Sequence, residues 1–152
     1  MSDKRFWEAM DDVRAAMLSI GSARHVPMSP YPEADRNRMW FIGAAGTDLV
    51  EALDAGQSDG SLIVTGADHV YARIEGRASL SSDRGKLEDL WNPVASSWFD
   101  GIDDPDIRLI EFIPSEAEIW ETTNSIGFMV EMAKSKMTGD TPDMGDHYTV
   151  RF

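Results

Sequence analysis

"VYARIEGRASLS", residues 70–81, alternates hydrophobic and polar side chains along nearly its whole length. Successive side chains of a strand lie on opposite faces of a sheet, so this period of two predicts one long, half-buried antiparallel strand. Gly76, in its middle, indicates a bulge or a close approach by another part of the chain. We expect residues 61–65, SLIVT, to pair with this strand through the turn at 66–69.

Upstream of this hairpin the sequence predicts two helices and a short strand. Hydrophobic residues at steps of three and four predict a helix over 3–18. The proline-rich, charged segment 27–38 is predicted to be a loop, and the run at 39–42 a buried strand. A short helix is expected over 48–54, with Thr47 as its N-cap.

Downstream, helical periodicity over 83–98 is interrupted by Pro93, which cannot stand inside a helix. We therefore expect Asn92 to cap a second short helix that begins at the proline. The hydrophobic runs 107–113 and 116–122 predict another hairpin, with its turn between them.

The C-terminal segment, 124–152, is predicted to hold a helix at 125–137 and a polar tail that can end in a strand. We see no repeat and no linker, so residues 1–152 are expected to form a single domain. Helices interspersed with antiparallel strand pairs predict an α+β fold built on a small barrel.

Composition limits the partners and the compartment. Fourteen Lys and Arg face 27 Asp and Glu, a formal net charge of −13, and such a surface repels nucleic acid and anionic lipid. There are no cysteines, which excludes disulfides, thiolate metal sites and a cysteine nucleophile. No apolar run approaches the ~20 residues of a membrane span, and residues 1–12 lack the core of a secretory signal. We expect a cytoplasmic protein with neither a nucleic-acid nor a membrane partner.

Motifs for metal binding or hydrolysis are missing. The three histidines are scattered, and "DGIDDPD", residues 100–106, has Pro105 where a calcium-binding loop requires glycine. No nucleophile elbow of the G-x-S-x-G type is present. We assign no catalytic and no metal-binding residues.

The stretch "FIGAAGTDLVEAL", residues 41–53, raises the question of an anion site. The first N–H groups of a helix are unpaired and can hold a phosphate, here together with the Thr47 hydroxyl. An ordinary strand-to-helix turn with a threonine cap explains the same residues. Asp48 suits the helix dipole but would repel a phosphate, so both interpretations stay open.

Four stretches together resemble one family: HVPM (25–28), WFIGAAGTDLVEAL (40–53), residues 75–112 and AEIWE (117–121). They are similar to the general-stress-protein branch of the pyridoxamine 5′-phosphate oxidase-like proteins, which are flavin-binding split barrels. The resemblance is strongest in "LWNPVASSWFDGIDDPD", a block that is long and unusual in composition.

The resemblance implies a six-stranded antiparallel split β-barrel with flanking helices, a homodimer, and FMN in a groove between the subunits. The cofactor-binding residues it implies are His25, Val26, Pro27, Met28, Gly43, Ala44, Ala45, Thr47, Trp98 and Trp120. The two tryptophans would wall the flavin ring or the dimer seam, or simply pack.

Two departures from the family remove positive charge. Val26 stands where relatives carry an arginine, and residues 43–45 replace a segment that brings a hydroxyl and a lysine to the phosphate. Losing two charged hydrogen bonds would weaken FMN on the order of a hundredfold. The candidates to replace these cations, each also explained by ordinary surface exposure, are Arg24, Arg73 and Arg77.

Two functions follow. The first is a general-stress-type protein that binds FMN, or FAD, and whose activity as an FMN-dependent oxidoreductase of unknown substrate is left open. The second is a split-barrel binding or structural protein that has lost its flavin affinity.

Overall fold

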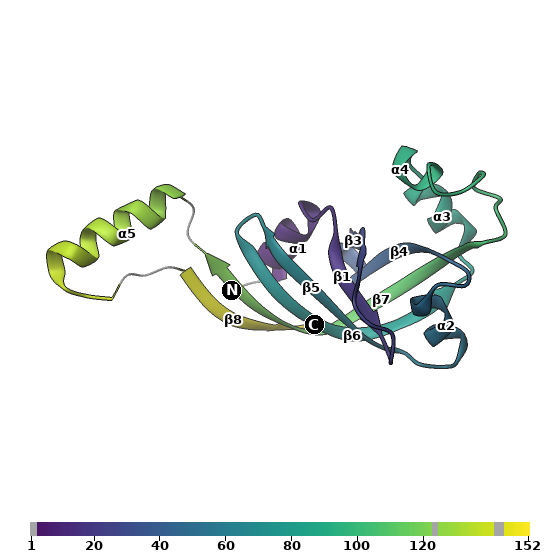
Figure 1. The fold of residues 1–152 in the computed structure, drawn as a ribbon, viewed down its shortest axis with the longest axis horizontal. Helices are drawn as coiled ribbons and strands as arrows, with labels where there is room; N and C mark the ends of the chain where they lie inside the picture. Colours follow the sequence, from purple (N-terminus) through teal and green to yellow (C-terminus); the bar gives the residue numbers. More distant parts are fainter. Residues whose placement is uncertain (1–2, 123–124, 142–144) are drawn as a thin grey trace.

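The computed structural model describes residues 3–122, 125–141 and 145–152, and shows an antiparallel sheet curled into a half-barrel with helices around it (Figure 1). This α+β split barrel confirms the predicted fold class. The strands follow the order β2-β1-β5-β6-β7-β4-β3, with β8 paired to β7. The described residues therefore form eight strands, where the family resemblance implied six.

The strands are β1 (Ala16–Ile20), β2 (Val26–Met28), β3 (Tyr31–Glu33), β4 (Arg38–Ala44), β5 (Asp59–Ala67), β6 (Val70–Ser81), β7 (Ile107–Thr122) and β8 (Gly145–Arg151). The helices are α1 (Asp3–Asp11), the 3-10 turn η1 (Ala34–Arg36), α2 (Asp48–Asp54), α3 (Arg84–Leu90), α4 (Pro93–Ser96) and α5 (Ser125–Thr138).

Strand β6 confirms the period-two prediction in both bounds, and buried and exposed side chains alternate along it, except that Leu80, expected on the hydrophobic face, is 39% exposed. It pairs with β5 on one side and with β7 on the other, and the register of the second pairing shifts between Glu75 and Gly76. A Cβ at Gly76 would lie 2.4 Å from the carbonyl oxygen of Ile113. The bulge and the close approach predicted from this glycine are therefore both present, and no larger residue fits there.

The predicted hairpin over 107–113 and 116–122 is wrong, because β7 is one continuous strand of 16 residues. Pro114, which we expected in a turn, lies opposite Gly76 at the bulge. A proline has no N–H to donate to the hydrogen-bond ladder between strands, and a bulge is one of the few places in a sheet that tolerate it. The first part of β7 pairs with β4 and the last part with β8, so β7 connects both of these strands to β6.

The predicted helix over 3–18 is wrong in its second half. Helix α1 ends at Asp11, and residues 16–20 form β1, in which alternate side chains are buried. The segment 27–38, predicted to be a loop, contributes to β2 and contains β3 and η1, each only three residues long.

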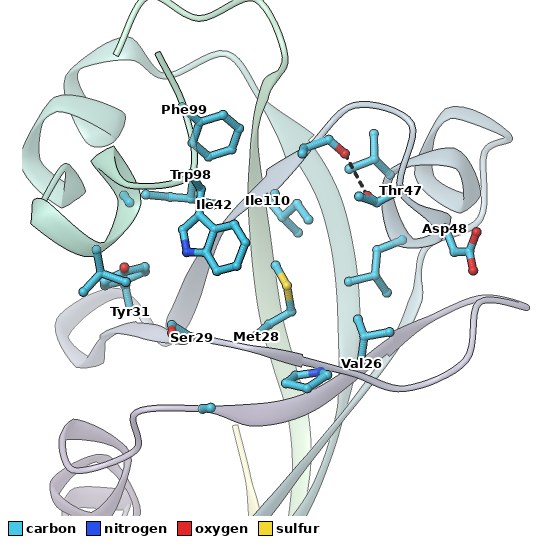
Figure 2. Close-up of a pocket in the computed structure, with 18 residues that line it drawn as sticks. Val26, Met28, Ser29, Tyr31, Ile42, Thr47, Asp48, Trp98, Phe99 and Ile110 are labelled. Carbon is cyan, nitrogen blue, oxygen red and sulfur yellow. Dashed lines mark hydrogen bonds between the residues drawn. The ribbon is translucent and has the colours of Figure 1, made fainter. Parts of the chain in front are cut away.

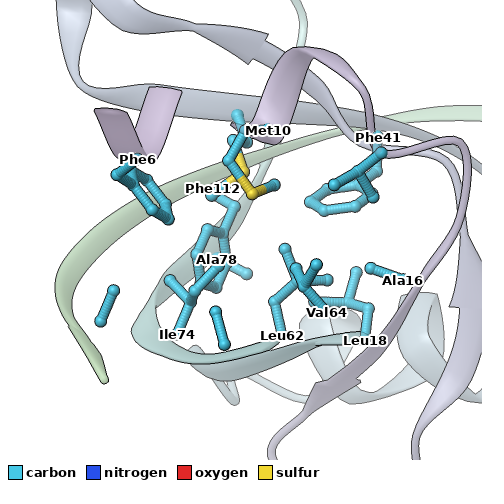
Figure 3. Close-up of a cluster of buried hydrophobic side chains, with 14 of the residues drawn as sticks. Phe6, Met10, Ala16, Leu18, Phe41, Leu62, Val64, Ile74, Ala78 and Phe112 are labelled. Atoms are coloured by element: carbon cyan, nitrogen blue, oxygen red, sulfur yellow. The ribbon is translucent and has the colours of Figure 1, made fainter. Parts of the chain in front are cut away.

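The concave side of the sheet is filled by hydrophobic side chains (Figure 3). Phe6 and Met10 of α1 lie over it, and Phe41 meets Phe112 edge-on at 6.4 Å between ring centroids. No polar or charged residue is buried in the part of the chain that is described. Removal of this apolar surface from water is the main stabilising contribution to the fold.

The predicted division of the 83–98 segment is confirmed. Asn92 precedes α4, and its side-chain oxygen accepts hydrogen bonds from the N–H groups of Val94 and Ala95 at 2.9 and 3.1 Å. Leu87 of α3 packs with Trp40 and Leu109 in a second, smaller cluster. The predicted C-terminal helix and final strand are present as α5 and β8.

Candidate functional site

A pocket of about 590 Å³ lies between β2, β4, α2 and the α4 region (Figure 2). This volume is within the range of sites that hold a cofactor or another drug-sized molecule. Its lining is predominantly apolar and consists of Ala15, Val26, Pro27, Met28, Ser29, Tyr31, Ile42, Gly43, Ala44, Thr47, Asp48, Leu49, Val50, Val94, Ala95, Trp98, Phe99 and Ile110.

The pocket exists because small residues stand where its walls meet. The second half of β4 contributes Gly43 and Ala44, and a Cβ at Gly43 would already lie 3.3 Å from a methyl carbon of Ile110. From the opposite side, Met28 of β2 and Trp98, just after α4, face the same space (Figure 2). Trp98 is 80% exposed, so its indole forms a solvent-accessible side of the pocket and is not part of the packed core.

Few polar groups reach the pocket, and Tyr31 is the best placed of them. Its hydroxyl oxygen accepts a hydrogen bond from the side-chain amide of Asn92 at 2.9 Å. The hydroxyl proton of Tyr31 has no acceptor among the described residues, so it is free to donate to a ligand. Since Asn92 also caps α4, one side chain holds both the helix and the tyrosine in position.

The protein's own oxygens occupy part of the predicted phosphate cradle. The Ala45 N–H donates to the carbonyl of Asp106 at 2.8 Å, and the Thr47 N–H donates to that of Ala44. The Thr47 hydroxyl donates to the same Ala44 carbonyl at 2.7 Å, the dashed line in Figure 2. Thr47 therefore occupies the N-cap position of α2 but makes no side-chain cap, and its hydroxyl offers no proton to a phosphate.

The remaining N–H groups of this turn, those of Gly46 and of the first turn of α2, have no acceptor within the described part of the chain. The Asp48 carboxylate is exposed and points away from the space between Met28 and Trp98 (Figure 2). No lysine or arginine is among the lining residues. The pocket thus fits an aromatic, largely uncharged body better than it fits an anion.

The structure brings together seven of the ten residues expected at the cofactor: Val26, Pro27, Met28, Gly43, Ala44, Thr47 and Trp98. The other three, His25, Ala45 and Trp120, lie outside the lining. His25 is exposed, with a ring nitrogen 3.5 Å from the hydroxyl of Ser61. Trp120, near the far end of β7, stacks on His147 with 4.9 Å between ring centroids.

The arginines considered as replacement cations lie outside the pocket lining. Arg73 forms an ion pair with Glu118 at 3.1 Å, and Arg77 contacts the hydroxyl of Ser58 at 3.0 Å. Both arginines are therefore ordinary surface residues.

Lys86, on α3, is held by a carboxylate close to the pocket. Its ammonium donates to Glu33 and lies 5.5 Å from the centroid of the Trp40 ring. This hydrogen bond is the main reason that the pKa of Glu33 lies below its usual value, and a bond from the Trp40 indole N–H acts in the same direction. Lys86 is thus neutralised within the protein and fastens α3 to β3.

Sequence reasoning missed most of the other lining residues, among them Ser29, Tyr31, Ile42 and Phe99. Tyr31 fell in a segment predicted to be a loop, and nothing in the sequence indicated that its hydroxyl would meet Asn92. Within the described residues, no cluster of histidines and carboxylates could hold a metal ion. No helix in the described ranges is long and apolar enough to cross a bilayer.

Comparisons with known proteins now add to this geometry. A search of curated proteins found no match. The sequence model of the family described as "Pyridoxamine 5'-phosphate oxidase like" matches residues 2–143. The chain belongs to this family. Within this pyridoxamine 5′-phosphate oxidase-like family, its similarity to general stress proteins confirms the branch suggested by the sequence.

Among solved structures, a protein named general stress protein 26 from Jannaschia sp. CCS1 is 40% identical, with both chains fully covered and a TM-score of 0.90. The general stress FMN/FAD binding protein of the phytopathogen Xanthomonas citri is 27% identical over 80% of this chain and 89% of its own, with a TM-score of 0.66. A protein from Clostridium acetobutylicum related to general stress protein 26 is 16% identical over 100% and 97% of the two chains, with a TM-score of 0.68, and supports the fold alone.

Proposed function

We propose that this chain is a flavin-binding protein of the general-stress type that works as a homodimer and holds the flavin ring in the pocket between β2, β4, α2 and α4. FMN is the preferred ligand and FAD the alternative. The observation that carries the proposal is an apolar pocket of about 590 Å³ with Trp98 and Phe99 in its wall. The relative from Xanthomonas citri, named an FMN/FAD binding protein, supports the same ligand class.

The lining fits the ring of a flavin. Aromatic faces and aliphatic side chains complement a flat conjugated system, and the free proton of Tyr31 can donate to one of its polar edge atoms. A bound flavin supplies the redox chemistry. The residues of this chain would bind it, orient it and limit the access of water, with Met28 and Trp98 facing the ring.

A second function, a split-barrel binding protein without flavin affinity, is favoured by one specific observation. The lining residues include no cation, and the Thr47 hydroxyl already donates to the Ala44 carbonyl. Charged hydrogen bonds to a phosphate contribute about 1.5–3 kcal/mol each, so a pocket that offers none is expected to bind FMN more weakly.

Titration of the purified protein with riboflavin, FMN and FAD decides between the two functions. If the chain binds flavin, the absorbance of the added ligand shifts and the melting temperature of the protein rises with ligand concentration. An unchanged spectrum and melting temperature with all three ligands at saturating concentration would support the second function.

Two tryptophan variants locate the site. Trp98→Ala removes an open wall of the pocket and is expected to weaken flavin binding on the order of tenfold, because a stacked aromatic contact is lost. Trp120→Ala is the matched control, since Trp120 is also partly exposed but lies outside the lining. Equal weakening by both variants would place the ligand elsewhere.

A further inference from the structure

Riboflavin and FMN have the same ring and the same ribityl chain, and they differ only in the terminal phosphate of FMN. The ring of either ligand suits the apolar part of the pocket, between Met28 and Trp98 (Figure 2). The phosphate of FMN needs a second region, and the turn at residues 43–47 is the one that the sequence predicts for it. What this turn offers to an anion therefore decides how the site treats the two ligands.

The turn has few donors left for a phosphate. The N–H of Ala45, and both the N–H and the hydroxyl of Thr47, donate to carbonyl oxygens of the protein itself. The N–H groups of Gly46 and of the first turn of α2 remain without an acceptor among the described residues. A helix presents the equivalent of about half a positive charge at this end, and α2 has only seven residues to build it.

Two full negative charges lie at the same end of α2. Asp48 and Glu51 are both in its first turn, and both are exposed. Residues three apart on a helix are neighbours on its surface, so the two carboxylates act on the same region. Neither forms an ion pair within the described ranges of the chain. A phosphate monoester carries about −1.5 to −2 charges at pH 7, so these carboxylates oppose the attraction of the free N–H groups.

One cation is placed beside the turn by the sheet, although it does not line the pocket. Arg108 of β7 is paired with Gly43 of β4, and in the described part of the chain it has no carboxylate partner. Its Nη1 donates to the carbonyl oxygens of Pro105 and Ile107 at 2.7 and 2.9 Å, which holds the guanidinium against the turn before β7. A guanidinium that left these carbonyls to meet a phosphate is the rival explanation that an experiment must address.

We infer that the pocket recognises flavin by its ring alone, because Asp48 and Glu51 cancel the attraction that the free N–H groups of the turn exert on a phosphate. This inference rests on the proposed function and states which part of the flavin the site selects. Riboflavin is then as good a ligand as FMN. The two carboxylates are specificity-determining residues, since they act on the phosphate and leave the ring unaffected.

The first test compares the dissociation constants of riboflavin and FMN, measured by the quenching of flavin fluorescence. We expect the two values to agree within about fivefold, because the phosphate adds no net attraction. Added salt should leave the riboflavin affinity unchanged and should not weaken FMN, since ions screen an exposed repulsion. An FMN affinity more than about fivefold above that of riboflavin would overturn the inference.

The second test removes the two carboxylates in the double variant Asp48→Asn, Glu51→Gln. At low ionic strength FMN is expected to bind on the order of tenfold more tightly, because the repulsion is lost, whereas riboflavin affinity is unchanged. Asp54→Asn is the matched control, since Asp54 is exposed at the other end of the same helix and lies outside the pocket lining. Unchanged FMN affinity in the double variant, or an equal gain in the control, would contradict the role of the carboxylates.

The third test addresses the rival cation. Arg108→Gln removes the guanidinium charge and is expected to leave the ratio of the FMN and riboflavin dissociation constants unchanged. Riboflavin serves as the internal control, because a variant with a disturbed fold would lose affinity for both ligands. A selective weakening of FMN would mean that Arg108 reaches the phosphate, and it would overturn the inference.

The wild-type protein separates failure of this inference from failure of the proposed function. If it binds neither riboflavin nor FMN, the proposed function is wrong, and the inference fails with it. If it binds FMN and not riboflavin, the flavin site stands and recognition by the ring alone is wrong.

Discussion

The interior of the half-barrel and the pocket beside it are both apolar, yet only the interior is filled. In the interior, space left by glycines is taken by one large ring: a Cβ at Gly60 or Gly76 would lie 2.6 or 2.9 Å from an atom of the Phe112 ring. In the pocket, small residues such as Gly43 and Ala44 face an opening of about 590 Å³. Strand β4 contributes to both regions, with Phe41 in the core and the two small residues at its end.

Hydrophobic composition therefore does not distinguish a core from a binding site in this chain. The difference is whether a large side chain occupies the space that a small one leaves. A close-packed interior stabilises the fold, whereas an unfilled apolar space keeps surface available for a ligand.

The largest expected effect comes from emptying the filled region. Phe112→Ala should lower the free energy of unfolding by about 3–5 kcal/mol, because it removes the ring that occupies the space beside both glycines. Urea denaturation measures this change. Trp98→Ala, a truncation of the same kind in the pocket wall, should change stability by less than about 0.5 kcal/mol because its side chain is largely exposed. Similar losses in the two variants would contradict the contrast between the regions.

A smaller effect is expected from overfilling the interior. In Gly76→Ala the added methyl group would lie 2.4 Å from the Ile113 carbonyl oxygen, so the bulge between β6 and β7 must shift. We expect a loss of about 1–3 kcal/mol in thermal or urea unfolding. The matched control is Gly85→Ala on α3, whose Cβ would meet nothing closer than 3.5 Å. That change should stabilise the protein by up to about 1 kcal/mol, and a loss at both positions would show that the close approach is not the cause.

The smallest effect concerns the ion pair beside the pocket. Because the pKa of Glu33 is lowered in the folded protein, its contribution to stability is present above the unfolded pKa of about 4.3 and is lost as the pH falls through the lower folded value. Lys86→Gln should lower stability by about 1 kcal/mol at pH 7 and make the decline between neutral pH and about pH 3 shallower. Melting temperatures across this range measure both effects, and an unchanged acid limb would refute the assignment to this pair.

How much of the fold was predictable depended on the length of each pattern. Residues 70–81 alternate over twelve positions, and both ends of β6 were predicted correctly. Strand β1 has only five residues, which is too short to show a clear alternation. Met17 lies four residues after Val13, so it continued the helical spacing of the preceding segment although it belongs to the strand. Pro114 concealed the continuity of β7, because a proline inside a strand usually indicates a turn. The strand accommodates this proline at the bulge opposite Gly76, which is far away in the sequence.

The pocket lining was predictable where the family resemblance covers a motif of this sequence, and unpredictable where only the folded chain brings residues together. Val26 to Met28 and the 43–47 turn were expected at the pocket and line it in part. Trp120 was expected there too, but it lies at the opposite end of β7. The hydrogen bond between Tyr31 and Asn92 joins residues 61 positions apart, and no local pattern encodes it.

The position of β7 in the sheet also determines when the pocket can form during synthesis. The neighbours of β4 in the sheet are β3 and β7, so until residues 107–122 are available the β3–β4 hairpin has no ladder to the rest of the barrel. Tyr31 and Ile42 belong to that hairpin, whereas Val26 and Met28 belong to β2. A growing chain therefore carries two separate parts of the candidate pocket, and a ligand that requires both parts is expected to recognise only a chain in which β7 has already paired with β4.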